Sequence, residues 1–148
     1  MFEKILVPLD GSKHSVHALE NAVQIAKKFD AKITLIHVYA VNLWPIGAGG
    51  IPEPTITIPV GQILEAARNA GASILVNGEK RVKAEGVQVE KLLKEGHTVE
   101  EILKTAKEGK FDLIVVGARG LSTIKEILLG SVSHGVTSHA PCPVLVVK

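Results

Sequence analysis

The chain has 148 residues, a length that predicts a single domain, residues 1–148, with a full hydrophobic core. Its formal net charge of +2 is too small to indicate nucleic-acid binding, and aromatic residues, at 3%, are too few for base-stacking surfaces. No apolar run approaches the roughly 18 residues of a membrane-spanning helix, and no secretory leader pattern opens the chain. The single cysteine fits a reducing compartment. These features predict a cytoplasmic protein that binds neither membrane nor nucleic acid.

The chain opens with a predicted buried strand over residues 4–9, followed by a turn and a helix. Pro8 has no backbone N–H, so it should lie at the end of the strand. Asp10 and Gly11 are typical turn residues, and Ser12 is a good N-cap for an amphipathic helix over residues 12–28. Two interpretations of Asp10 remain open. Its carboxylate either stabilises the turn, or accepts a hydrogen bond from a ribose hydroxyl or a metal-bound water.

The second predicted strand, residues 31–39, is rich in β-branched residues. His37 and Val38 lie at its carboxyl end, where open parallel sheets bind ligands. Val38 belongs to the core, to a site, or to both, and His37 is expected to pack or hydrogen-bond locally.

On the preceding helix, His14 and His17 are one turn apart. Two imidazoles without a third ligand make a poor metal site, so a solvent-facing position is expected for both.

Residues 41–59 form an unusually long predicted loop, which contains four of the seven prolines. The loop is too apolar for a plain linker. It either folds over a ligand, joins a subunit contact, or is a partly ordered excursion.

A second helix is predicted over residues 60–85. Gly71 and Gly78 lie on its apolar face, where they lower helix propensity but allow close packing.

A shorter third strand is predicted over residues 87–93, at an edge of the sheet, and Gly96 ends it. Thr98 and Glu101 have the spacing of a capping box, Thr-x-x-Glu, which predicts the start of a third helix. Gly109 is expected to end that helix. Strands and helices therefore alternate along the chain, which predicts an α/β fold with a mostly parallel sheet.

The most informative stretch covers residues 112–133. It begins with an apolar run, LIVV, typical of a strand that is buried on both faces. Gly117 and Gly120 follow, and after nine further residues come Gly130 and Ser131. Such glycines let the backbone approach an anion, and a helix starting near Ser131 would direct free N–H groups at it. The spacing matches neither the Walker loop nor the Rossmann motif, so two successive glycine turns without a ligand are an equally good interpretation.

Three segments resemble the universal stress protein family, in its ATP-binding form. They are the opening KILVPLDGS, the pattern Gly-x2-Gly-x9-Gly-Ser after VVG, and the closing CPVLVV. They lie at the start, the core and the end, so the resemblance covers the whole chain. It implies an open, Rossmann-like sheet of five parallel strands in the order 3-2-1-4-5, with helices on both faces. The chain then reverses direction between strands 1 and 4, and ligands bind at such a switch point.

The resemblance also implies an ATP site at this point. Pro8, Asp10 and Val38 would hold the adenosine, with the backbone at Val38 pairing with the adenine edge. The triphosphate would be held by Gly117, Arg119, Gly120, Gly130, Ser131 and Ser133, while Leu9 and Val132 complete the nucleotide-binding set. Mg²⁺ beside the phosphates is implied as well, without an identified ligand set. Replacing Gly117 or Gly130 by valine is expected to abolish ATP binding in a protein that stays folded.

No Walker lysine, kinase motif set or residue that would orient water is evident, so at most weak ATP hydrolysis is expected. The first hypothesis is a nucleotide-dependent regulatory or sensor protein of the stress response, acting on protein partners that the sequence does not name. The alternatives are a slow ATPase or phosphotransferase, and a dimeric interaction protein without bound nucleotide.

The chain ends with a short predicted helix over about residues 131–138 and a strand over Val144–Val147. The strand residues Val144, Leu145, Val146 and Val147 include no charge and no proline, and an apolar edge of this kind pairs readily with another chain. The resemblance also implies dimerisation through the last strand. A homodimer with antiparallel Val144–Val147 strands at its centre is therefore predicted. The alternative is an edge covered by the loop over residues 41–59.

Overall fold

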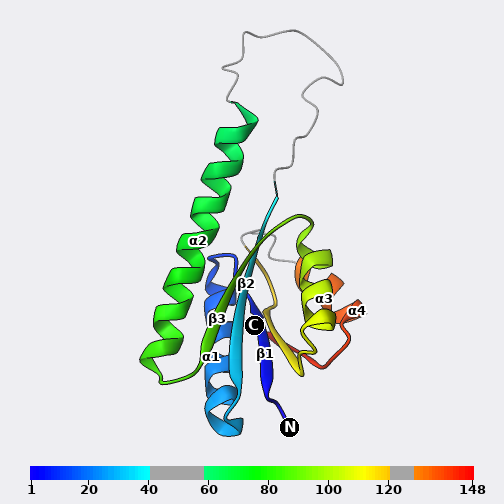
Figure 1. Ribbon diagram of the computed structural model, residues 1–148. Helices are drawn as coiled ribbons and strands as arrows, with labels where there is room; N and C mark the ends of the chain where they lie inside the picture. Colours follow the sequence, from blue (N-terminus) through cyan, green and yellow to red (C-terminus); the bar gives the residue numbers. More distant parts are fainter. Residues whose placement is uncertain (41–58, 121–128) are drawn as a thin grey trace.

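The computed structural model describes residues 1–40, 59–120 and 129–148. Its strands and helices alternate along the chain, as predicted (Figure 1). In chain order they are β1 (Lys4–Pro8), α1 (Lys13–Phe29), β2 (Lys32–Tyr39), α2 (Val60–Ala84), β3 (Val89–Glu95), α3 (Thr98–Glu108), β4 (Leu113–Gly117), α4 (Ser131–His139) and β5 (Val144–Val147). The predictions made for residues 41–58 fall outside the described residues.

The five strands form one parallel sheet in the order β3-β2-β1-β4-β5, which confirms the order that the family resemblance implied. β1 and β4 are neighbours although they lie far apart in the sequence, and their register pairs Ile5 with Leu113. Because both strands are parallel, their carboxyl ends meet at one edge of the sheet. The turns that follow Pro8 and Gly117 are therefore brought together at the switch point.

Helices cover both faces of the sheet, with α1 and α2 on one face and α3 and α4 on the other (Figure 1). Successive side chains of β1 point to opposite faces of the sheet. Ile5 and Val7 belong to the core under α1 and α2, whereas Leu6 belongs to the core under α3 and α4. All three side chains are fully buried, which explains why this strand has a continuous apolar run rather than an alternating one.

Two local predictions about the first two helices are confirmed. Ser12 caps α1, because its Oγ accepts a hydrogen bond from the backbone N–H of Ser15 at 3.2 Å. The glycines of α2 allow this helix to lie close to the sheet. A Cβ on Gly71 would lie 2.4 Å from Cδ2 of His37, and one on Gly78 would lie 2.6 Å from Cδ1 of Leu9. Among the described helices, none is long and apolar enough to cross a lipid bilayer.

Two other local predictions differ from the structure. β3 is an edge strand that ends before Gly96, as expected, but it runs over Val89–Glu95 instead of residues 87–93, because it pairs with β2 as far as Tyr39. The capping box does not form, since α3 begins at Thr98 with His97 as its N-cap and has no side-chain cap bond. Gly96, with a φ of 147°, turns the chain before His97, and Thr98 is therefore already inside the helix.

Candidate functional site

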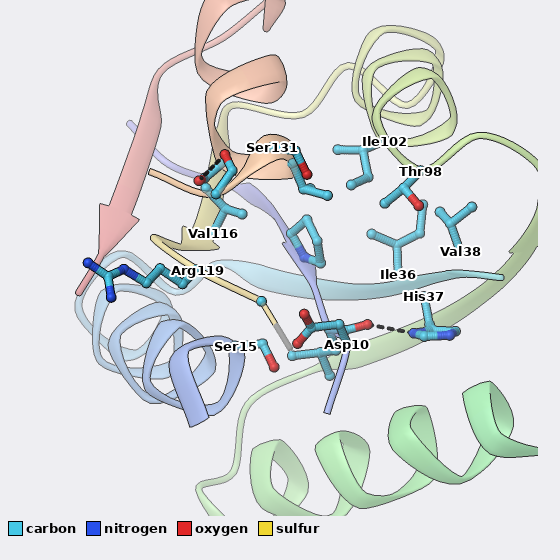
Figure 2. Close-up of a pocket in the computed structure, with 17 residues that line it drawn as sticks. Asp10, Ser15, Ile36, His37, Val38, Thr98, Ile102, Val116, Arg119 and Ser131 are labelled. Atoms are coloured by element: carbon cyan, nitrogen blue, oxygen red, sulfur yellow. Dashed lines mark hydrogen bonds between the residues drawn. The ribbon is translucent and has the colours of Figure 1, made fainter. Parts of the chain in front are cut away.

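A cavity of about 310 Å³ lies at the carboxyl edge of the sheet, beside the ends of β1, β2 and β4 (Figure 2). This volume falls within the range of small-molecule sites, about 300–1,000 Å³. All the residues that the sequence analysis assigned to a nucleotide site line this cavity: Pro8, Leu9, Asp10, Val38, Gly117, Arg119, Gly120, Gly130, Ser131, Val132 and Ser133. Segments from both halves of the sequence therefore line one cavity.

The cavity has two chemically different ends, with Asp10 between them (Figure 2). The glycine end consists of Gly117, Arg119, Gly120, Gly130 and Ser131, and a Cβ on Gly130 would lie 3.4 Å from Cα of Arg119. The apolar end lies on the β2 side and consists of Ile36, Val38, Thr98, Ile102 and Val132. A ligand that spans the cavity would need a polar or anionic part and a flat or apolar part.

Asp10 joins the β1 turn to the glycine end. Its Oδ1 accepts a hydrogen bond from the backbone N–H of Ser12 at 2.9 Å, so the turn interpretation of this residue holds. Its other oxygen, Oδ2, faces Gly120, where a Cβ would lie only 2.4 Å from it. Gly120 therefore has to be a glycine for the carboxylate to keep this position. The cavity-facing position of the carboxylate leaves the ligand interpretation open beside the structural one.

Gly117 has a packing role that the sequence analysis did not predict. A Cβ at this position would lie 2.7 Å from the backbone carbonyl carbon of His14 and 2.9 Å from its Cβ, so α1 already occupies that space. A valine at this position would therefore force α1 or β4 to move and lower the stability of the protein, while the expectation that the variant stays folded remains a prediction. The solvent-facing position expected for His14 holds only in part: the residue is partly exposed, but its Nδ1 is buried and has no hydrogen-bond partner within the described part of the chain. His17 is exposed, as expected.

A small hydrogen-bonded clamp holds the start of α4 against the end of β4. The carbonyl of Ala118 accepts from the N–H of Gly130 at 2.6 Å and from Oγ of Ser133 at 2.8 Å. Oγ of Ser133 also lies 3.0 Å from the carbonyl of Gly130, and the residue is 2% exposed. Because one hydroxyl has one hydrogen, the donor of Ser133 is used within the clamp. This residue can offer a ligand its backbone N–H but no free hydroxyl hydrogen.

The beginning of α4 supplies polar groups to the glycine end. Gly130 is the N-cap and is extended, with no side-chain cap bond, and Ser131 is the first residue of the helix. The first N–H groups of any α-helix have no acceptor within the helix. Those of Ser131 and Val132 therefore lie beside the cavity together with the exposed hydroxyl of Ser131. Such a helix start favours an anionic group.

Six further residues line the cavity that the sequence analysis did not assign to it: Ser15, Ile36, His37, Thr98, Ile102 and Val116. Thr98 is the informative omission, because its spacing to Glu101 suggested a capping box instead. Its place just after the carboxyl end of β3 was the signal that could have revealed it. His37 was expected to hydrogen-bond locally, and its Nδ1 does lie 2.6 Å from the carbonyl oxygen of Leu9.

The fold and the cavity together define a class, that of α/β proteins with a ligand-sized cavity at the switch point of an open parallel sheet. A sequence model of the universal stress protein family matches residues 1–148. The universal stress protein YxiE of Bacillus subtilis is 40% identical over 152 residues, with 100% of each chain covered. The chain belongs to the universal stress protein family.

Solved structures of relatives agree with this assignment. The universal stress protein UspA from Lactobacillus plantarum has a TM-score of 0.83 and 26% identity, with 99% of this chain and 98% of that chain covered. A universal stress protein in complex with cAMP has a TM-score of 0.72 and 31% identity, with 99% of this chain and 97% of that chain covered. The similarity therefore extends over the whole sheet and all its helices.

Proposed function

We propose that this chain is a regulatory universal stress protein that binds ATP in the cavity between β1 and β4. The observation that carries the proposal is the meeting of Asp10, the three motif glycines and the start of α4 around one space of about 310 Å³. A solved universal stress protein that is 31% identical is described as a complex with cAMP, which supports an adenine nucleotide as the ligand class.

The two ends of the cavity suit the two parts of ATP. The triphosphate would lie at the glycine end, against the N–H groups of Ser131 and Val132 and the positive charge of Arg119. The adenine would lie at the apolar end, with its edge toward the backbone of Val38. Between them, Oδ2 of Asp10 would accept a hydrogen bond from a ribose hydroxyl, because Oδ1 already bonds to Ser12.

Mg²⁺ would enter this site with the phosphates of ATP. This ion keeps several waters and usually takes only one or two carboxylates besides phosphate oxygens. The carboxylate of Asp10 is the one carboxylate among the described residues that line the cavity, so the donor set fits such a shared, phosphate-based site. The positive charge of Mg²⁺ would offset part of the negative charge of the triphosphate.

The chemistry of the described lining supports the proposal of a regulatory role rather than rapid catalysis. It contains one carboxylate, Asp10, whose Oδ1 already accepts from Ser12, and His37, whose Nδ1 is bonded to Leu9. No lysine is among these residues. We expect hydrolysis no faster than roughly one turnover per minute, against about 10 per second for a median enzyme. Faster turnover that disappears in Asp10→Asn would favour the slow-ATPase alternative instead.

Mass spectrometry of the freshly purified, denatured protein tests the proposal most directly. An adenine nucleotide in the released fraction, and ATP binding by calorimetry after its removal, are the expected results. The control is GTP, which should bind more weakly. If the protein carries no nucleotide and shows no heat of binding with ATP, the result would favour the other alternative, a dimeric interaction protein without bound nucleotide.

We propose in addition that the chain forms a homodimer through β5, which ends the sheet beside β4. The carbonyl of Pro143 accepts a bond from the N–H of Ile114 in β4, and that of Val147 accepts one from the N–H of Ala118 just after it. The alternation of β5 therefore directs the N–H of Val146 outward. Leu145 is 37% exposed. Val146→Pro should thus remove an outward donor and weaken the dimer in sedimentation experiments. A monomeric wild type at micromolar concentration, or an equally tight mutant dimer, would overturn the interface.

A further inference from the structure

At the cavity, the hydrogen-bond ladder between β1 and β2 stops one bond short of Val38. The last pair in the register is Pro8 with Ile36, and the N–H of Leu9 donates to the carbonyl of Ile36 at 2.9 Å. In a continuing parallel ladder, the next bond would join the N–H of Val38 to the carbonyl of Leu9. Within the described residues that bond is missing. The carbonyl of Leu9 instead lies 2.6 Å from Nδ1 of His37.

His37 can take this carbonyl because of where α2 lies. Side chains alternate along β2, so Ile36 and Val38 face α3 and α4 while His37 faces α2. Gly71 of α2 leaves room for the ring, since a Cβ there would lie 2.4 Å from its Cδ2. A carbonyl oxygen only accepts hydrogen bonds, so Nδ1 carries the hydrogen. The bond holds the Leu9 carbonyl beside the ring of His37, on which the dashed line in Figure 2 ends.

The consequence for Val38 is a donor and an acceptor that both lack a ladder partner on the β1 side. In a strand, the N–H and the C=O of one residue point to the same side. The partner for the C=O of Val38 would be the N–H of Gly11, but the chain turns away there, with φ at 84° for Gly11. The donor and the acceptor therefore lie side by side at the apolar end of the cavity.

We propose that His37 is a positioning residue that holds the Leu9 carbonyl away from Val38 and so keeps this backbone pair open for a nucleobase. The proposal rests on the proposed function for the identity of the ligand. An adenine edge offers a ring nitrogen that accepts and an amino group that donates, which complements the N–H and C=O of Val38. Guanine offers the opposite order at the same positions, an oxo group and a ring N–H. The same geometry therefore selects adenine.

Two variants separate this role from simple packing. His37→Leu has a similar volume but no donor, so the Leu9 carbonyl is released and can pair with the N–H of Val38. His37→Asn keeps an N–H at nearly the position of Nδ1 and should restore the wild-type arrangement. Circular dichroism and urea unfolding identify any variant that has lost its fold.

The first measurement uses ligand-free protein and amide hydrogen exchange observed by NMR. In the wild type, the amide of Val38 should exchange much faster than that of Ile36, which is bonded within the ladder. In His37→Leu the amide of Val38 should become protected, while His37→Asn should resemble the wild type. A protected Val38 amide in the wild type, or unchanged exchange in His37→Leu, would overturn the proposal. This measurement decides it even if the protein binds no ATP.

The second measurement is calorimetry with ATP and GTP. His37→Leu should weaken ATP binding about three- to tenfold, the effect of one neutral hydrogen bond, and should leave GTP binding nearly unchanged. His37→Asn should recover most of the ATP affinity. Equal loss for ATP and GTP in His37→Leu would mean that His37 supports the cavity only by packing, which contradicts the proposal. Absence of ATP binding by the wild type itself would contradict the proposed function alone.

Discussion

At the glycine end of the cavity the wall is made largely of backbone, whereas at the apolar end it is made of side chains. Beside Gly117 and Gly120, the missing Cβ atoms leave space that α1 and Asp10 occupy, at distances below 3 Å from where a Cβ would be. At the apolar end, Ile36, Ile102 and Val132 belong to the core under α3 and α4 as well as to the cavity. At Gly117 and Gly120 the first wall has no room for an added atom, while the second wall can change shape at a moderate cost in stability.

The largest expected effect concerns Gly117. In Gly117→Val the new Cβ would overlap the backbone of His14, so α1 or β4 has to move. We expect the free energy of unfolding to fall by about 3 kcal/mol or more, the upper range for overpacking. Urea unfolding followed by circular dichroism measures it. An unfolding midpoint equal to that of the wild type would show that the glycine end is not closed as tightly as the structure has it.

The next effect separates two glycines of the same motif. Gly120→Ala places a Cβ 2.4 Å from Oδ2 of Asp10 and should displace that carboxylate, so ATP binding should weaken at least about tenfold through the loss of a charge-assisted hydrogen bond. Gly130→Ala is the matched control, because its nearest contacts would be an ordinary 3.4 Å to Cα of Arg119 and 3.5 Å to the carbonyl of Ala118. Calorimetry should show little change for the control. Equal affinities for the two variants would contradict this account of Asp10.

A smaller effect is expected at the apolar end from Ile102→Val. Ile102 is 1% exposed, so removing one methylene should cost about 1 kcal/mol of unfolding free energy and weaken ATP binding slightly. Ile114→Val is the control, since Ile114 belongs to the same core but does not line the cavity. It should lose similar stability in urea and keep its ATP affinity. If both variants lost ATP affinity alike, the apolar end would not contact the base.

The smallest effect is expected for Thr98→Val, which keeps the shape of the side chain and removes its hydroxyl. Thr98 lines the cavity and is partly exposed, so water can replace part of any hydrogen bond that it makes. ATP affinity should fall by about twofold, the low end for a neutral hydrogen bond. Thr98→Ser keeps the hydroxyl and should bind as the wild type does. A large loss for Thr98→Val, measured by calorimetry, would show that the apolar end reads the base through this side chain.

The sequence by itself determined the alternation of strands and helices, the strand ends at Pro8 and Gly117, and the residues of the glycine end. These features can be predicted from short segments of sequence, because apolar runs, turn residues and glycine spacing act between near neighbours in the chain. The cap at Ser12 and the helical glycines Gly71 and Gly78 were predictable for the same reason. The family resemblance added the strand order, which local patterns do not contain.

Only the tertiary structure decided how the apolar end is built and why particular residues are needed. Thr98 and Ile102 come from α3, far in sequence from Val38, and only the packing of α3 on β2 brings them together. Gly117 faces α1 and Gly120 faces Asp10, contacts that glycine spacing cannot indicate. The bond from His37 to Leu9 likewise requires the register of β1 on β2 and the room left by Gly71. Such contacts depend on which surfaces meet after the chain has folded, and no local pattern encodes that.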